Sequence, residues 1–360
     1  MRSPHVTLCL LWSIIAATQG IADPVKAPVG GVSGLNEGYS IQRTPSKKVA
    51  CTLFYMVVAP QLDAQEWVFV APWAPDTPGQ NVQYVRSSPA GKIACDHSIY
   101  ERKLLTCRII GGESTRTTAG VKVFYGAQLY ARHLSKNDEL AAVKTTVENL
   151  TKSDRSLFLR ADQYYGHRNT DFSAWVKEKG YLRRKGEGEI DFAGRVFQDM
   201  AQSFTYDYAV KMDRSLMSVC HDRKSDCGGL SFVFVSVMRS QGIPARSMFG
   251  RWATSAVKDQ KVKGVDYYQS HVKAEFYAQG VGWVPVDISS AVLHDRSESK
   301  LAYFGQDKGD FITMHFDPGL EVDSYHFGKQ KLDWLQNVVF WVSGSGSLNG
   351  RIGTGGWEVK

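Results

Sequence analysis

The stretch Ser225–Arg246, SDCGGLSFVFVSVMRSQGIPAR, decides how the rest of this chain is interpreted. Its apolar residues recur at three- and four-residue spacing, which predicts a helix with a buried face. They are Leu230, Val233, Phe234, Val237 and Met238. Phe232 and Val235 widen that face, so the helix is expected to be almost entirely buried. Gly242 stands where a left-handed C-terminal cap belongs, and Pro244 cannot continue a helix.

A cysteine lies in the first turn of this predicted helix. Asp226 can cap free backbone amides, and Gly228 with Gly229 lets the backbone approach a ligand. The positive end of the helix dipole favours a thiolate, so the pKa of Cys227 is expected to lie well below that of a free cysteine. Backbone amides at this helix start, including that of Cys227, are candidates for stabilising an oxyanion. The stretch therefore predicts a reactive cysteine.

The composition is that of an ordinary globular protein. The chain has 360 residues, 43% hydrophobic and 12% aromatic, enough for a substantial core and compatible with two domains. The net charge is +7, but the basic residues are scattered and their longest cluster is Arg183–Lys185. No recognition motif accompanies the charge, so nucleic acid is not expected as a partner.

The N-terminus has the pattern of a secretory signal peptide over residues 1–22. Arg2 precedes an apolar run from Val6 to Ala17, and small residues lead up to a cleavage site before Asp23. The run is too short to span a bilayer, and no later segment approaches about 20 uninterrupted apolar residues, so no membrane span is expected. The mature protein is therefore predicted to be exported, to a periplasm or to the extracellular space.

Six cysteines occur, and the signal peptide would remove Cys9. Five would remain in an oxidising compartment, where disulfides form, so at least one should stay a free thiol. If that thiol is Cys227, the other four could form up to two disulfides, with Cys95 and Cys107 as the preferred pair. The others are Cys51 and Cys220. The sequence alone does not fix the pairing.

Composition shifts divide the chain into segments. Residues 23–46 form a predicted flexible leader, and residues 47–135 hold short apolar runs between turn clusters, which favours an immunoglobulin-like β-sandwich. Residues 136–156 form a helical linker whose helix covers 137–150. Residues 157–342 form the catalytic domain, and residues 343–360 are a Gly/Ser-rich tail expected to be flexible. Within the sandwich, His97 and His133 are expected to be surface or satisfied histidines.

The catalytic domain is predicted to be α+β. Helices over Thr170–Lys179 and Asp191–Phe204 precede the cysteine helix. Strands over Ala245–Trp252, Ser270–Tyr277 and Gly282–Ile288 follow it. Helices followed by an antiparallel sheet are typical of this class.

Two further residues complete a possible catalytic triad. His271 opens the strand-like stretch SHVKAEFY, and Asp287 lies in GWVPVDIS. A thiol needs a base to remove its proton, and the base needs a partner that fixes its tautomer. An unpaired carboxylate after an apolar strand would be costly, and His271 would resolve that cost. His221, in the loop CHDRKSDC, is the second choice of base. Three more histidines are weaker candidates for the base: His294, His315 and His326.

This order of motifs, with Ala302–Gly305 downstream, resembles the transglutaminase-like superfamily from about Leu157 to Trp341, its exported bacterial members in particular. The resemblance implies a papain-like cysteine-protease fold behind a β-sandwich. It also implies that Cys227, His271 and Asp287 are nucleophile, base and orienting acid. Attack of the thiol on an amide of a protein or peptide would give an acyl-enzyme thioester. A cell-wall peptide is one candidate substrate. Hydrolysis is preferred, because bacterial members are mostly regarded as predicted proteases. A glutamine-crosslinking transferase and a non-catalytic scaffold of the same fold are the two competing functions.

The sequence also departs from the family pattern. Members often carry an aromatic residue soon after the histidine, whereas Val272 and Lys273 follow it here. Lys273 is expected to point away from His271 or to lie near the mouth of the site. The oxyanion-stabilising tryptophan of the animal enzymes has no recognisable equivalent, and Tyr206 and Gln202 are possible donors. Calcium sites are not recognisable and no residues have metal-ligand spacing, so no cofactor is expected.

Overall fold

The computed structural model describes residues 36–136, 149–209, 211–254, 261–262, 265–266, 269–296 and 301–360. The predicted signal peptide and nearly all of the predicted helix over 137–150 lie outside these ranges. Within them, none of the helices combines the length and the apolar character needed to cross a membrane.

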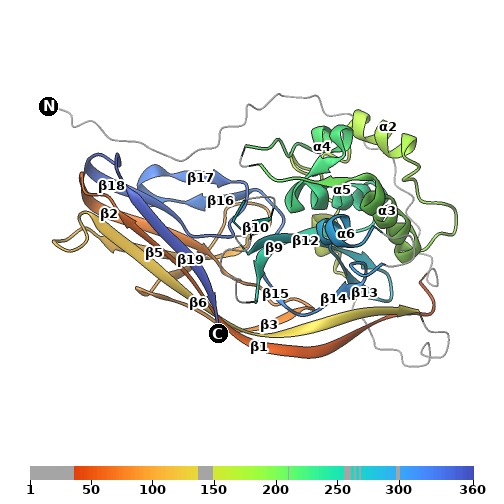
Figure 1. Ribbon diagram of the computed structural model, residues 1–360, viewed down its shortest axis with the longest axis horizontal. Coiled ribbons are helices and arrows are strands. Elements are labelled where there is room, and N and C mark those ends of the chain that lie inside the picture. Colours follow the sequence, from red (N-terminus) through yellow and green to blue (C-terminus); the bar gives the residue numbers. More distant parts are fainter. Residues whose placement is uncertain are drawn as a thin grey trace.

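Two sheets face each other in the part of the molecule that holds the N-terminal strands (Figure 1). One has the order β14-β6-β1-β19 with β3 also paired to β6, and the other has the order β18-β2-β5-β4. Their strands are β1 (Tyr39–Val58), β2 (Leu62–Pro72), β3 (Gln80–Ser88), β4 (Lys92–Cys95), β5 (Lys103–Ile110), β6 (Thr118–Lys136), β14 (Gln306–Asp307), β18 (Val339–Gly346) and β19 (Ile352–Val359).

Apolar side chains from both sheets form a single core. Trp67 and Phe69 of β2 lie in the same buried cluster as Val123 and Tyr125 of β6. The alternation of apolar and polar residues along these strands puts one face of each sheet into this core. The sheet-rich region agrees with the predicted β-rich domain, while its immunoglobulin-like topology stays a prediction.

The C-terminal segment corrects the predicted domain boundaries. Residues 343–360 were expected to form a flexible tail, but the structure places them in the end of β18 and in β19. β19 pairs with β1 over eight residues, from Cys51 opposite Val359 to Val58 opposite Ile352. Most glycines of this segment pass close to neighbouring residues: a Cβ on Gly346 would lie 2.1 Å from the carbonyl oxygen of Gln61. The glycine content therefore reflects close backbone packing in a sheet and not a linker.

The predicted leader is also partly strand, because β1 begins at Tyr39. It pairs with β6 from Tyr39 opposite Lys136 onward, with an irregularity between Pro45 and Lys48. A proline cannot donate to a ladder and is tolerated at such a bulge. Pro45 interrupts the apolar pattern, and for this reason the first part of β1 was not predicted as a strand.

The second part of the molecule is a helix layer on an antiparallel sheet of order β13-β12-β9-β15, which confirms the α+β prediction (Figure 1). Its strands are β9 (Ala245–Trp252), β12 (Ser270–Ala278), β13 (Gly282–Val286) and β15 (Phe311–Phe316). Its helices are α1 (Lys152–Leu157), α2 (Thr170–Glu178), α3 (Glu189–Ser203), α4 (Leu216–Asp222), α5 (Cys227–Ser240) and α6 (Ile288–His294). The short elements are β7 (Thr205–Tyr206), β8 (Lys224–Ser225), β10 (Lys261–Val262), β11 (Val265–Asp266), β16 (Leu320–Asp323), η2 (Tyr325–Phe327) and β17 (Lys329–Leu332).

Helix α5 is the centre of this part, as the sequence predicts. Every residue from Gly228 to Arg239 is buried, and the helix packs on β12 and β9. It ends in a Schellman motif: Gly242 has a φ of 74°, its amide donates to Arg239, and the amide of Ile243 donates to Met238. Both helix ends are therefore fixed by local chemistry, which places Cys227 reproducibly at the first turn.

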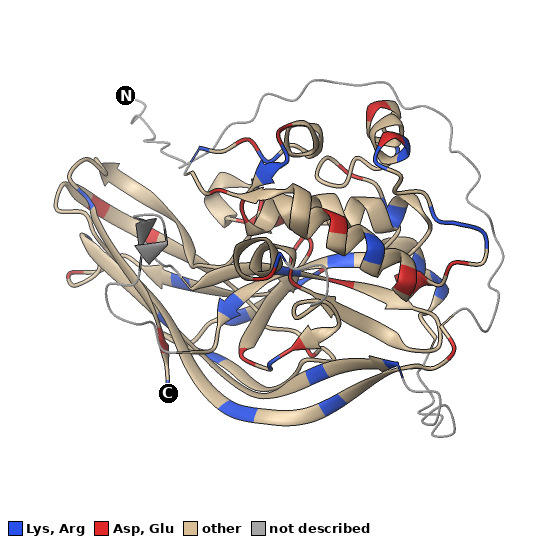
Figure 2. Ribbon diagram, turned by 45° about the vertical axis from the view of Figure 1, so that its right-hand side comes forward, with Lys and Arg blue, Asp and Glu red and all other residues tan. Residues whose placement is uncertain are grey.

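Buried ion pairs join the two parts of the molecule. Arg132 of β6 contacts Glu275 of β12 at 3.0 Å and Asp307 of β14 at 3.5 Å. Glu275 also binds Arg246, and Asp307 also binds Lys273. Elsewhere, basic and acidic residues are interspersed along the helices and strands (Figure 2).

Candidate active site

Cys227 is the first residue of α5, and its thiol lies against β12. A hydrogen bond from the backbone of Val272 reaches the thiol, and one turn further along α5 the hydroxyl of Ser231 donates to the carbonyl of Val272 at 3.4 Å. Two side chains on one face of the helix therefore contact the backbone of Val272, the residue that follows His271. Cys227 itself is half-buried and packs against the core of the helix layer.

The expectation of a lowered thiol pKa is wrong. Burial raises the pKa of Cys227 strongly, and the negative charge of Asp226 raises it further, outweighing the Val272 hydrogen bond and the positive charge of Arg214. Asp226 caps α5 by accepting from the amides of Gly228 at 3.1 Å and Gly229 at 3.2 Å. The cap that starts the helix thus brings a carboxylate next to the thiol and occupies two of the amides that were candidates for an oxyanion site.

His271 and Asp287 form a hydrogen-bonded pair. The imidazole Nε2 and the carboxylate Oδ2 lie 2.9 Å apart, with side-chain exposures of 11% and 5%. β13 ends at Val286, so Asp287 is not a strand residue as predicted but the N-cap of α6, where its Oδ1 accepts from the amide of Ser290 at 3.0 Å. One oxygen therefore caps a helix while the other orients the imidazole.

The charge of this pair fixes the tautomer of the histidine. Burial would raise the pKa of Asp287, but the charge and hydrogen bond of His271, together with Lys273, hold it well below the ordinary value. An ionised carboxylate can only accept, so Nε2 of His271 donates. In the neutral imidazole the lone pair is then on Nδ1, which is the nitrogen available to take a proton.

Two aromatic rings that the sequence analysis did not predict lie against the imidazole. Trp252, at the end of β9, stacks on His271 with a ring separation of 4.7 Å, and Phe311 of β15 meets it edge-on at 6.1 Å. The ammonium of Lys273 lies over the same two rings, at 4.7 and 4.8 Å. The prediction that Lys273 points away from His271 or lies at the mouth of the site is wrong, because residues two apart on a strand share a face and this face is covered.

The two side chains considered as oxyanion donors occupy different surroundings. Tyr206 lies on β7, directly opposite Ser225 in the register with β8, two residues before the cysteine. Gln202 lies exposed on α3. No sequence pattern singles out Tyr206, since β7 is only two residues long.

The other histidines that the sequence analysis considered either bind other residues or lie exposed. His315 is buried, stacks on Phe249 and accepts from the amide of Leu335, while His326 binds Glu66 next to Arg108. His221 and His294 are exposed near the ends of α4 and α6. His97 is exposed, and His133 contacts Gln306 at 2.6 Å, which agrees with their prediction as surface or satisfied residues.

The structure contradicts the predicted disulfide between Cys95 and Cys107. All five cysteines in the described ranges are free thiols. The β4–β5 register places Cys95 opposite Lys103 rather than opposite Cys107. Cys95 is exposed at the edge strand, whereas Cys107 is buried beside Ser87 at 3.3 Å. No group of His, Cys, Asp and Glu suited to a metal ion occurs in the described residues.

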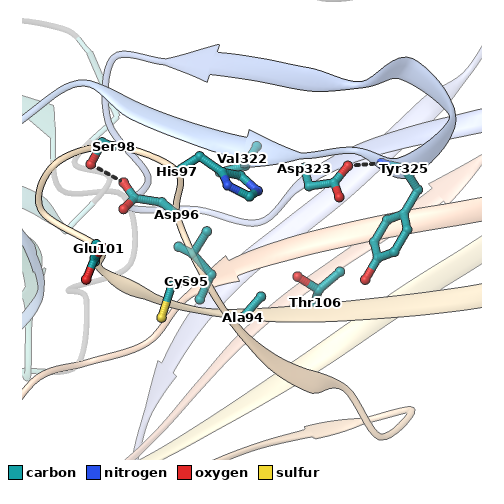
Figure 3. A pocket seen from close by; sticks show the side chains of 11 residues that line it. Ala94, Cys95, Asp96, His97, Ser98, Glu101, Thr106, Val322, Asp323 and Tyr325 are labelled. Carbon is teal, nitrogen blue, oxygen red and sulfur yellow. Dashed lines mark hydrogen bonds between the residues drawn. The ribbon is translucent and has the colours of Figure 1, made fainter.

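A separate cavity of about 500 Å³ lies between the β4–β5 turn and β16 (Figure 3). Its polar side chains serve the local structure: Asp96 binds the buried Arg102 and accepts from Ser98, and Asp323 accepts from the amide of Tyr325. None of the three predicted catalytic residues lines it.

These features define a class of α+β domains in which a cysteine opens a buried helix and a histidine on the sheet beneath pairs with a carboxylate that follows the neighbouring strand. Residues 179–288 match the sequence model of the transglutaminase-like superfamily, a range that includes all three predicted catalytic residues. This part of the chain is a transglutaminase-like domain.

The individual proteins that resemble this chain match it at low sequence identity or over a small part of its length. An uncharacterised protein of Haemophilus influenzae is 30% identical over 125 residues, which is 31% of this chain and 30% of the relative, so the match spans less than a third of that protein. A structure from Cytophaga hutchinsonii, described as a candidate cysteine protease, has a TM-score of 0.48 at 13% identity over 89% of this chain and all of the other. The periplasmic domain of TgpA from Pseudomonas aeruginosa has a TM-score of 0.36 at 12% identity over 75% of this chain and 99% of the other.

Proposed function

We propose that the protein is an exported thiol enzyme that cleaves amide bonds of a protein or peptide through Cys227, His271 and Asp287. The observation that carries the proposal is the hydrogen bond between His271 and Asp287, which leaves Nδ1 as the basic nitrogen of the imidazole. The next residue of the same strand, Val272, contacts the thiol through its backbone. The match to the transglutaminase-like superfamily supports it. Export rests on the predicted signal peptide.

In the proposed reaction, Nδ1 of His271 removes the proton of Cys227 as the sulfur attacks the carbonyl carbon of the amide. The raised pKa of the thiol means that it is neutral at rest, so the histidine acts as a general base during attack. The protonated imidazole then gives this proton to the leaving amine, and an acyl-enzyme thioester remains. Asp287 stabilises the imidazolium and keeps its orientation.

Water or an amine resolves the thioester, and this choice separates a protease or amidase from a crosslinking transferase. We propose water as the acceptor. Cys227 is half-buried and not fully enclosed, and water that reaches the thioester can compete with an amine.

The test is a library of glutamine-containing peptides incubated with and without a primary amine, with products identified by mass spectrometry. Peptide cleavage or deamidation in the absence of amine is expected, and Cys227→Ser should remove it. Products that form only with amine would replace hydrolysis by transfer. Absence of any Cys227-dependent product under both conditions would favour the non-catalytic scaffold.

A further inference from the structure

We infer that the segment Asp333–Asn337, which we call the strap, positions both halves of the proposed catalytic site, through Gln336 on the histidine side and Trp334 on the cysteine side. The inference rests on the proposed function, since it assigns positioning residues to the same reaction. The strap connects β17 to β18 and lies outside residues 179–288.

The side chain of Gln336 holds the backbone at His271. Its amide nitrogen donates to the carbonyl of His271 at 2.7 Å and to the carbonyl of Gly250 at 2.8 Å. These two residues are directly opposite each other in the β12–β9 register. β13 pairs with β12 only from Ala274 onward, so among the described strands the start of β12 has a neighbour, β9, on one side alone. One buried amide therefore fixes the strand pair at the proposed base.

The strap is itself held by the β13-β12-β9-β15 sheet. The amide of Leu335 donates to Nε2 of His315 at 3.1 Å, and Arg251 of β9 donates to the carbonyl of Gln336 at 2.8 Å. Burial, with a smaller contribution from Arg102, lowers the pKa of His315 to about 3, so its ring stays neutral and can accept. These two contacts anchor the backbone of the strap to β15 and β9, and so they fix where the Gln336 side chain lies.

Trp334 connects the strap to the cysteine side. Its ring stacks on Phe249 with a separation of 6.3 Å and an interplanar angle of 13°, and the guanidinium of Arg214 lies 5.3 Å from its centroid. Arg214 in turn donates to Asp226, the N-cap of α5, at 2.9 and 2.6 Å. The ring thus limits where the guanidinium, and through it the cap next to Cys227, can lie.

The strap therefore contacts both halves of the site and continues into β18, which pairs with β2 of the N-terminal sheets. Small errors in the placement of reacting groups are costly: about 1 Å can reduce a rate on the order of a hundredfold. A segment that fixes the base and the helix cap from one side is suited to preventing such errors.

The experiment compares Gln336→Met with Gln80→Met. Gln80 is a matched control, because it is also buried and its amide also donates to two backbone carbonyls, those of Pro75 at 2.7 Å and Thr313 at 2.8 Å, neither of which belongs to β12. Both variants should lower the midpoint of thermal unfolding. Only Gln336→Met should lower kcat for the amide substrate, by roughly tenfold with KM changed less than about twofold.

A second readout needs no substrate: the rate at which iodoacetamide alkylates Cys227 at pH 7, compared with that of His271→Ala. Gln336→Met should lose most of the histidine-dependent rate. Wild-type kcat in a folded Gln336→Met, or an equal loss in Gln80→Met, would overturn the inference. Alkylation that is independent of His271 in the wild type would instead overturn the proposed function. If Gln336→Met does not fold, Gln336→Asn, which keeps the amide but shortens its reach, should show the same loss.

Discussion

The two halves of the proposed site differ in how they hold charge. On the histidine side, Asp287 keeps its charge because His271, Lys273 and the Ser290 amide stabilise it, so its pKa is lowered despite burial. On the cysteine side, burial and the nearby Asp226 raise the pKa of the thiol. Before substrate binds, the Asp287 carboxylate is therefore already ionised, while the Cys227 thiol is neutral.

This difference indicates the order of events in the proposed reaction. A cysteine with a lowered pKa would exist as a thiolate before substrate binds, and the histidine would already be protonated. Here the proton stays on sulfur until His271 takes it during attack. The histidine side therefore should determine most of the rate, and removing its base or its orienting acid should have a larger effect than changing the charge next to the thiol.

The largest effect is expected from His271→Ala. Removing the base should reduce kcat/KM by a factor on the order of 10³, within the range for general-base catalysis, because the neutral thiol has no other proton acceptor in this scheme. Steady-state amidolysis measures it. His326→Ala is the matched control, since His326 also binds a buried carboxylate, that of Glu66, in another part of the molecule. Comparable losses in the two variants would show that the His271 effect is one of stability.

The next largest effect is expected from Asp287→Asn. The amide oxygen can still cap α6, but the charge that orients and stabilises the imidazolium is lost, so kcat should fall on the order of a hundredfold. Because the folded-state pKa of Asp287 is lowered, its pairing stabilises the fold above about pH 4 and this stabilisation is lost as the pH falls. Denaturation monitored against pH should therefore show a shallower acid decline in the variant. An unchanged decline would contradict the pairing.

A smaller effect of opposite sign is expected from Asp226→Asn. Asparagine is an equally good N-cap, so α5 should keep its start, while the carboxylate that raises the pKa of Cys227 is removed and Arg214 loses its partner. The thiol pKa should fall, and alkylation by iodoacetamide at pH 7 should accelerate roughly tenfold for each unit of that fall. The midpoint of alkylation against pH is the measurement. Slower alkylation would mean that Asp226 orders the thiol rather than suppressing its ionisation.

The sequence predicted the elements whose causes are local. The bounds of α5 follow from Asp226, the apolar spacing and Gly242, and the three predicted core strands appear within two residues of their expected ends. The pairing of His271 with Asp287 was also predicted, because a carboxylate next to an apolar strand needs a partner.

What the sequence did not reveal depends on contacts between distant segments. Trp252 and Gln336 reach His271 from strands and loops with no fixed spacing to it, and the last strand, β19, contains few apolar residues because its role is to pair with β1. The thiol pKa was missed for a related reason. The helix dipole is a local effect, but the burial that outweighs it comes from the packing of α5 on β12.

The smallest expected effect tests how the charge on the histidine side is maintained. Lys273→Met keeps the aliphatic stem between Trp252 and Phe311 but removes a positive charge that helps to hold the pKa of Asp287 low. That pKa should rise, so the acid decline in the free energy of unfolding should end at a higher pH, and kcat at neutral pH should fall by roughly threefold at most. Lys329→Met, which removes an exposed ion pair with Glu321, should change neither quantity. If the acid decline of Lys273→Met coincides with that of the wild type, the Ser290 amide and His271 alone keep Asp287 ionised. The ion pairs that run from Lys273 to Arg132 then serve only to join the two parts of the molecule.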